Sequence, residues 1–295
     1  MTQRTRLMVI HNPASGAKNA RRFAKAINAL VERGCSIDIR KTTGPGHAEE
    51  LARMATQIPA RPEAVIVAGG DGTLAEVAQG LRGSDLPMGV IPLGTANVFA
   101  HEIGLKSGNG AVADAIMGGP SVPIFPGLAD GQRFLLMVGS GYDSHAVCAL
   151  VSAEKKKWGA LAYLFAALRV RGDFKTFDVR VSTPSDELRG ASIIISRARH
   201  FGGPFCAFPD ADLTQPVLNT LVLKNAGVGS ALKYGFALLL GTLDRFTMVE
   251  RLSTTDCLQL ESQKPGNFQM DGDGCERQQI TVSVDTEALY VLMPQ

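Results

Sequence analysis

Short apolar runs alternate with segments of helical periodicity along the first part of the chain. Residues 19–33 carry apolar side chains at spacings of three and four, as one face of an amphipathic helix does, and Gly34 follows them. Further helices are predicted at residues 47–58 and 73–81. The apolar runs that predict strands are RLMVIH (6–11), CSIDIR (35–40), EAVIVA (63–68) and MGVIPL (88–93). This alternation predicts a parallel sheet covered by helices, a fold in which ligands bind beyond the carboxyl ends of the strands.

After residue 123 the pattern changes to short apolar runs separated by Gly, Pro, Asn and Asp. The runs are FLLMVGSG (134–141), FDVRVST (177–183), ASIIIS (191–196), NTLVLK (219–224), MVERL (248–252), CLQLE (257–261), NFQMD (267–271), ITVSV (280–284) and LYVLM (289–293). Many short strands with turn signals between them predict an antiparallel β-sandwich. We therefore expect an α/β domain over residues 1–123 and an all-β sandwich domain over residues 124–295, and we leave open that the extreme C-terminal segment returns to the first domain.

Composition and charge narrow the possible functions. The 295 residues are 45% apolar and 20% charged, with a net charge of +2, which is too balanced for binding nucleic acid by neutralising its phosphates. The five cysteines are scattered and lack C-x-x-C spacing, so neither a disulfide framework nor a zinc site is predicted, and the cytoplasm is the expected compartment. The amino terminus has too few apolar residues for a signal-peptide core. The densest apolar run, YGFALLLGTL from Tyr234, is too short to span a bilayer.

The stretch GGDGT (69–73) stands between a predicted strand and a predicted helix. The free N–H groups and the positive dipole end of that helix face the loop, and glycines let the backbone approach a phosphate. A tight turn without a ligand is the alternative for so short a motif. No G-x-G-x-x-G follows the first strand and no Walker sequence is present, so a phosphate would be held in another way. Similar loops, HNPASG (11–16) and PLGTANVFAHEIG (92–104), follow two other strands, and the three would converge on one cleft.

Four motifs follow one another along the chain: NPASG (12–16), GGDGT (69–73), PLGTAN (92–97) and QMDGDG (269–274). In order and spacing they resemble the motifs of bacterial lipid kinases of the diacylglycerol kinase catalytic-domain family, to which sphingosine and ceramide kinases are related, and GSGYDSHAV (139–147) also fits. The resemblance implies an α/β nucleotide domain and a β-sandwich domain, with ATP bound between them. It implies phosphorylation of a lipid hydroxyl by ATP and Mg²⁺, with diacylglycerol as the first candidate acceptor and phosphatidic acid as the product.

The resemblance also assigns site residues by motif. Nucleotide contacts would come from Asn12, Thr42, Gly69, Gly70, Asp71, Gly72, Thr73 and Thr95. Asp71 is the charged member of this set and could ligate or orient the Mg²⁺ that accompanies ATP. Family members carry Asp-Gly-Glu in the downstream motif, and the glutamate is thought to take the proton from the lipid hydroxyl. The matching residue here is Asp273, one methylene shorter, which we expect to be the catalytic base. The alternative is that residues 271–274 form only a hairpin turn.

A second departure from the family pattern concerns metal binding. Relatives commonly carry Asp-Gly where this chain has Gln215 and Pro216, and in some of them that aspartate helps to bind a structural magnesium ion. Because an amide is a poorer ligand for a hard cation, we expect no firmly held metal at this loop. Asp210 and Asp212 are expected to be solvated loop acids. The five histidines have no metal-ligand spacing, so a zinc site is not expected. His101, after GTAN, could touch substrate in the expected cleft, but an ordinary surface or helix role is the commoner case.

The segment KKKWGALAYLFAALRVRGDFK (155–175) has an apolar helical face with basic residues at both ends. Such a helix could lie on anionic lipid or line a lipid pocket, although packing into the core is the commoner use of such a face. We expect a lipid substrate at a membrane surface, peripheral membrane contact and no nucleic-acid partner, and we leave a homodimer open. The alternative functions are a sphingoid-base or ceramide kinase, an NAD kinase, whose nucleotide domain also carries a Gly-Gly-Asp-Gly loop, and a non-catalytic sensor of lipid or nucleotide.

Overall fold

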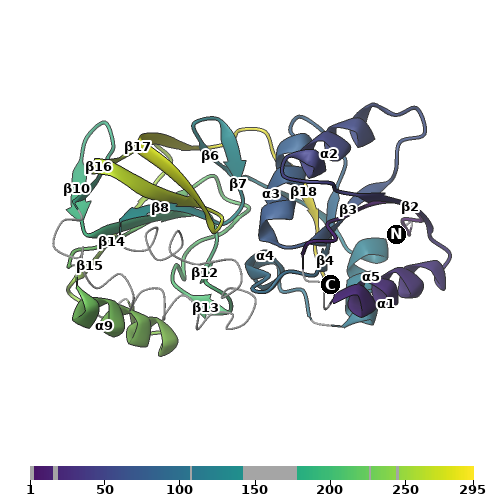
Figure 1. Cartoon of the computed structure of the whole chain (residues 1–295), viewed down its shortest axis with the longest axis horizontal. Coiled ribbons are helices and arrows are strands. Elements are labelled where there is room, and N and C mark those ends of the chain that lie inside the picture. Colours follow the sequence, from purple (N-terminus) through teal and green to yellow (C-terminus); the bar gives the residue numbers. More distant parts are fainter. Residues whose placement is uncertain (1–2, 16–18, 107, 142–177, 226, 244–245) are drawn as a thin grey trace. The chain divides into compact units, whose positions relative to one another are not determined.

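The chain forms two compact units in the computed structural model (Figure 1). The structure describes residues 3–15, 19–106, 108–141, 178–225, 227–243 and 246–295. The first unit consists of Met1–Phe125 and Thr286–Gln295, and the second of Pro126–Asp285. The chain therefore crosses between the units twice, and its last segment belongs to the first unit, a return that the sequence left open.

A six-stranded sheet forms the centre of the first unit. Its strands, in spatial order, are β2 (Ser36–Lys41), β1 (Arg6–His11), β3 (Ala64–Gly69), β4 (Met88–Pro92), β18 (Leu289–Leu292) and β5 (Ser121–Ile124). All neighbours pair in parallel except β18 and β5, which are antiparallel. Every residue of β3 is buried, as expected for a central strand with helices on both faces. The parallel α/β domain predicted from the alternation of strand and helix is thus confirmed.

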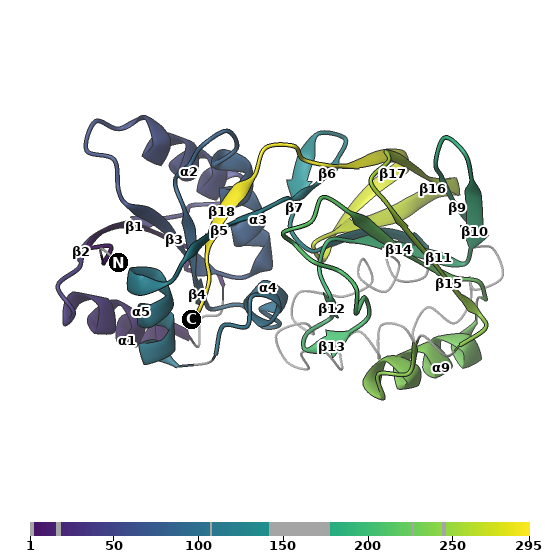
Figure 2. The ribbon, with the colours of Figure 1, turned by 180° about the vertical axis from the view of Figure 1, so that it is seen from behind.

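Helices cover both faces of this sheet (Figure 2). They are α1 (Ala20–Val31), α2 (His47–Gln57), α3 (Asp71–Gly80), α4 (Val98–Glu102) and α5 (Asn109–Gly118). Leu30 of α1 and Ile116 of α5 share one buried cluster with Val9 and Ile66 of the sheet. On the other side α2 packs against α3, where a Cβ added to Gly80 would lie 2.3 Å from a backbone carbonyl oxygen of α2. This close helix contact requires glycine at that position.

The second unit is built from antiparallel strands. Its main sheet contains β6 (Gly127–Ala129), β7 (Gln132–Phe134), β8 (Met137–Gly141), β9 (Val179–Ser182), β10 (Glu187–Gly190), β11 (Ser192–Ser196), β14 (Leu218–Leu223), β15 (Val249–Thr254), β16 (Leu258–Met270) and β17 (Asp273–Val284). Strands β12 (His200–Phe201) and β13 (Phe205–Cys206) form a small ribbon. The inward side chains, among them Phe134, Ile193 and Phe268, make one core. The change to an antiparallel, β-rich second half is as the sequence predicts.

One strand prediction was wrong. The sequence divides CLQLE and NFQMD into separate strands because Lys264, Pro265 and Gly266 signal a break, but both belong to the single strand β16. The ladder with β17 absorbs these residues as a register shift between Glu261 and Gly266. The first part of β16 pairs with β9 and its last part with β8, so this one strand joins two parts of the sheet.

A buried ion pair lies in the second unit, close to the residues at which the chain enters and leaves that unit. The Arg133 guanidinium lies 2.7 Å from the Asp285 carboxylate, and both side chains are fully buried. The backbone N–H of Asp285 donates to the carbonyl oxygen of Pro126 at 2.8 Å. These contacts hold the segments that leave the second unit beside each other.

Candidate active site

The three glycine-containing loops of the first unit follow β1, β3 and β4, which are adjacent and parallel. Their carboxyl ends therefore lie at one edge of the sheet. Hydrogen bonds join the loops: the N–H of Asn12 donates to the carbonyl of Ala68 at 3.0 Å, and the N–H of Leu93 donates to that of Gly69 at 2.8 Å. The side-chain amide of Asn12 donates to the Thr73 hydroxyl at 2.9 Å. The structure thus brings two predicted site residues from distant motifs into direct contact.

Asp71 is the first residue of α3, and its carboxylate is already engaged. One oxygen accepts the N–H of Val98 at 3.1 Å and the other accepts the N–H of Phe99 at 3.0 Å. These N–H groups belong to the first turn of α4, which has no capping bond from its own Asn97 side chain. A carboxylate at a helix N-terminus is favourable both as an acceptor and against the helix dipole. Asp71 therefore fastens α4 to α3, a role that the sequence did not reveal.

The glycines at this edge are needed for contact between loops. A Cβ added to Gly94 would lie 2.7 Å from the Cα of Gly70, and one added to Gly69 would lie 2.8 Å from the Thr73 side chain. Asn97 holds the tight approach, since its side chain accepts the N–H of Gly94 at 2.7 Å and donates to the same residue's carbonyl at 2.9 Å. The sequence analysis attributed Gly69 and Gly70 to approach by a phosphate. In the structure, packing against Gly94 of the next loop is a sufficient reason for Gly70, and the Thr73 side chain is a sufficient reason for Gly69.

The remaining predicted nucleotide contacts lie along the same edge. Thr42 follows β2 and donates its backbone N–H to the carbonyl of His11 at 2.9 Å. Thr95 is exposed in the loop after β4, Gly72 is half-buried in the first turn of α3, and Thr73 is buried. The loop edge also contains the N-terminus of α3, where the positive end of the helix dipole favours an anion.

His11, the last residue of β1, lies at the same edge, and its structural role was not predicted from the sequence. Its ring stacks on Phe23, with ring centroids 3.9 Å apart and planes 7° from parallel. Burial, and secondly the charge of Lys41, lower the pKa of His11. The imidazole is therefore held neutral at physiological pH. An isolated His-Asn-Pro at the end of a strand carries no signal for a stacking partner on the following helix.

The downstream QMDGDG motif forms the turn between β16 and β17. Asp271 and Gly272 have φ values of 49° and 86°, and Met270 pairs with Asp273 across the turn, as in a two-residue type I′ hairpin. The Asp271 carboxylate accepts the N–H groups of Leu135, Leu136 and Met137 at 2.7 to 2.9 Å. Asp271 therefore binds the hairpin turn to the backbone of residues 135–137.

Asp273 occupies a different environment from Asp271. It is the first residue of β17 and is exposed. The turn before it is fixed on two sides, by Asp271 and by the Gln269 side chain, which accepts the N–H of Gly272 at 3.0 Å. The alternative of a hairpin turn therefore describes Asp271 and Gly272, whereas the role of Asp273 as a base remains a prediction.

The loop that carries Gln215 contains a cation of its own. The side chain of Arg197, at the end of β11, is fully buried, and its guanidinium donates to the backbone carbonyls of Asp212, Leu213, Gln215 and Val217. Burial lowers the pKa of Arg197 to about 10, and the charge of Asp212 counteracts this shift. The Asp212 carboxylate accepts from the backbone and hydroxyl of Thr214, each at 2.8 Å. Arg197 thus supplies positive charge to the carbonyls of this loop, and the expectation of no structural metal there stays a prediction.

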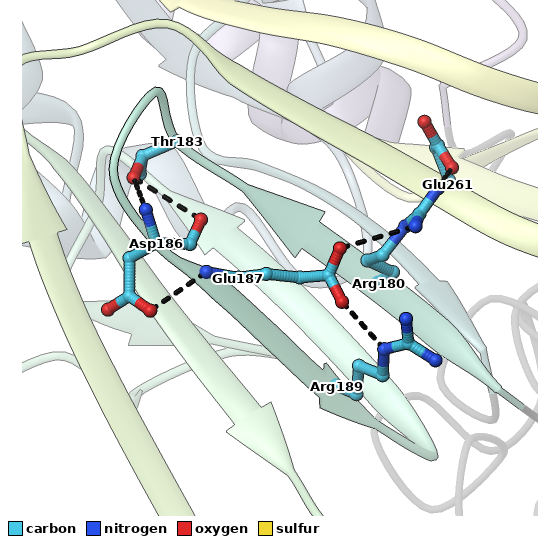
Figure 3. A network of polar contacts seen from close by, with 6 residues as sticks. All are labelled: Arg180, Thr183, Asp186, Glu187, Arg189 and Glu261. Atoms are coloured by element: carbon cyan, nitrogen blue, oxygen red, sulfur yellow. Dashed lines mark hydrogen bonds and ion pairs between the residues drawn. The ribbon is translucent and has the colours of Figure 1, made fainter.

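A network of polar side chains joins β9, β10 and β16 (Figure 3). Glu187 accepts from Arg180 and Arg189, and Arg180 also pairs with Glu261. Arg180, Arg189 and Glu261 line a pocket, and Asp178 lines it as well. Because three carboxylates face two guanidinium groups, the charge does not favour an anion. Partly exposed ion pairs of this kind contribute little stability each. The network is best explained as support for the β9–β10 hairpin.

Other predictions concern membrane contact and metals. The amphipathic segment at residues 155–175 lies outside the described residues. Within the described part of the chain, no helix is long and apolar enough to cross a membrane. The same residues contain no cluster of three or more His, Cys, Asp or Glu side chains that could hold a metal ion.

Comparison with protein families covers most of the chain. A model of the diacylglycerol kinase catalytic domain matches residues 6–128, and a model of the YegS C-terminal NAD kinase beta sandwich-like domain matches residues 136–293. The chain belongs to the diacylglycerol kinase catalytic-domain family. The family resemblance inferred from the motifs is confirmed, and so is the expected β-sandwich domain. By this membership the chain is a lipid kinase that uses ATP.

Individual relatives agree with this assignment. A Pseudomonas putida (strain KT2440) protein named "Probable lipid kinase YegS-like" is 30% identical, with 76% of this chain and 75% of the relative covered. The diacylglycerol kinase of Bacillus subtilis (strain 168) is 27% identical, with 80% and 79% covered. The crystal structure of a diacylglycerol kinase from Bacillus anthracis str. Sterne superposes with a TM-score of 0.72 at 16% identity, with 99% and 98% covered. This structural likeness establishes the fold.

Proposed function

We propose that this chain transfers the γ-phosphoryl group of Mg·ATP to the hydroxyl of diacylglycerol, giving phosphatidic acid and ADP. The observation that carries the proposal is the match of both family models over nearly the whole chain, in the order catalytic domain and then β-sandwich domain. The naming of a Bacillus subtilis relative as a diacylglycerol kinase favours this acceptor over a sphingoid base.

The nucleotide site in this proposal is the loop edge of the first unit. The triphosphate binds at the N-terminus of α3, with contacts from Asn12, Thr42, Thr95 and the run Gly69–Thr73. The hydrogen bonds from Asn12 to Thr73 and from α4 to Asp71 support it, because they hold three loops in fixed positions before any ligand arrives. Loops that are fixed in advance lower the cost of positioning groups around a transferring phosphoryl group.

Two aspartates have separate tasks in the reaction. Asp71 orients the loops and places negative charge near the Mg²⁺ that ATP brings, and a hard cation of this kind prefers such oxygen ligands. Asp273 accepts the proton of the lipid hydroxyl while that oxygen attacks the γ-phosphorus and the bond to ADP breaks. The rigid turn beside Asp273 supports this role, because general-base catalysis requires a carboxylate in a fixed position.

An acceptor panel tests the proposal. Purified protein is incubated with radiolabelled ATP, Mg²⁺ and, separately, diacylglycerol, sphingosine, ceramide or NAD, and the products are separated. We expect label in phosphatidic acid at a rate well above that of the other acceptors. Label in phosphorylated sphingosine or ceramide would show a lipid kinase with a different acceptor lipid. Label only in phosphorylated NAD would reject the proposal.

A further inference from the structure

The helix α9 (Val228–Leu239) of the second unit carries an exposed apolar face. Phe236, Leu239 and Leu240 are 64%, 61% and 60% exposed. In the described part of the chain, three other large hydrophobic side chains are exposed, but less so, at 40–54%, and these are scattered over α1, β2 and α2. Spacings of three and four place the residues of α9 on adjacent turns of one side. They form one patch, whereas single exposed hydrophobic side chains are ordinary.

The opposite side of α9 fixes which face points outward. Tyr234 and Ala237 are buried against the unit. The Tyr234 hydroxyl donates to the carbonyl of Met248 at 3.2 Å and accepts the N–H of Asn225 at 3.3 Å. The helix cannot turn its apolar patch inward without breaking these contacts. Both ribbon views place α9 at the margin of the second unit, next to β13 and β15 (Figures 1 and 2).

Charge and size indicate what covers this patch. Between residues 227 and 243 the only charged side chain is the exposed Lys233, which lies three residues before Phe236 and seven before Leu240 and so shares their side of the helix. Within residues 227–243, which the structure describes, an apolar patch with a positive edge and no carboxylate is complementary to a bilayer that contains anionic lipid. Three side chains expose much less than the ~800 Å² per partner that a stable protein dimer buries. Twelve residues span about 18 Å, too short to cross a bilayer but suited to lying in its surface.

We propose that α9 docks on the surface of an anionic bilayer, with Phe236, Leu239 and Leu240 inserted below the headgroups and Lys233 beside lipid phosphates. The docking rests on the proposed function for its purpose, since the acceptor lipid resides in the membrane. It gives the second unit a surface that holds the enzyme where its substrate is.

Vesicle flotation without ATP or acceptor lipid tests the docking independently of catalysis. The full chain is mixed with vesicles of phosphatidylcholine and phosphatidylglycerol, and the variant Phe236→Ser/Leu239→Ser/Leu240→Ser is compared with Val31→Ser/Ile39→Ser/Met54→Ser, which changes the same number of exposed apolar side chains elsewhere. We expect the α9 variant to float about tenfold less than wild type. The control variant should float as wild type does. Equal flotation of all three proteins would overturn the proposal.

A second measurement avoids loss of folding as an explanation. Leu240→Trp in a Trp158→Phe background makes residue 240 the single tryptophan of the chain. Its emission should shift to shorter wavelength when the anionic vesicles are added, and an unchanged spectrum would count against insertion. A dimer in solution that the α9 triple variant abolishes, with flotation unaffected, would assign the patch to a second copy and overturn the proposal. A protein that floats as expected but phosphorylates no lipid would keep the docking and reject the proposed function.

Discussion

Replacing Asp71 with alanine should destabilise the first unit as well as impair catalysis. The substitution removes both acceptors for the N–H groups of Val98 and Phe99, at 3.1 and 3.0 Å. Hydrogen bonds to a charged group contribute about 1.5–3 kcal/mol each, and partial exposure of Asp71 reduces this, so we expect a loss of about 2–4 kcal/mol in the free energy of unfolding. For a unit of this size that loss lowers the Tm by roughly 5–15 °C.

Calorimetry measures this effect, and Asp114→Ala is the matched control. Asp114 belongs to the same unit and pairs with Arg33 at 2.7 Å, but its side chain is 73% exposed, so its removal should cost less than about 1 kcal/mol. Asp71→Asn keeps the size and one acceptor oxygen and should fall between alanine and wild type. If Asp71→Ala melted like wild type while losing activity, Asp71 would act only on the nucleotide and its contact with α4 would be unimportant for stability.

Three further substitutions test other parts of the account. Asp273→Ala should lower kcat by about 10²–10⁴-fold with little change in ATP affinity, and steady-state kinetics that show Asp273→Asn matching wild type would reduce Asp273 to a turn residue. Arg197→Met should lower the free energy of unfolding by about 3–5 kcal/mol in urea titrations, because it removes the buried guanidinium that donates to four backbone carbonyls; an unchanged urea midpoint would refute this. Since the folded-state pKa of His11 is lowered, protonation favours the unfolded chain, and stability should fall as pH drops below about 6.5. His11→Phe should weaken that pH dependence, and an identical dependence in the variant would show that other groups cause it.

The sequence predicts best where local pattern determines structure. Strand β3 is a continuous apolar run and α1 has a clear apolar face, so both could be located within a few residues. The break expected inside β16 was wrong because a long ladder can absorb Pro265 and Gly266 as an irregularity. Helix α9 was noted only as a dense apolar run, since side chains that are apolar on most sides give no helical stripe.

The motifs in the sequence identify the residues of the candidate site, but they do not predict which residues these side chains contact. The partners of Asp71 lie 27 and 28 residues away in the sequence, and nothing local identifies them. Arg197 is a single basic residue after an apolar strand, and only the folded loop shows that backbone carbonyls surround it. Likewise, a Gly-Asp-Gly triplet does not show whether a glycine makes room for a ligand or for a neighbouring loop. Gly70 makes room for the loop that contains Gly94.

The most direct test of lipid phosphorylation is to measure ADP and phosphatidic acid formed from Mg·ATP and diacylglycerol in the same reaction. The account predicts equal amounts of the two products with wild-type protein and a loss of both, by about 10²-fold or more, with Asp273→Ala. ADP formed without phosphatidic acid, or phosphatidic acid formed equally fast by the variant, would contradict it.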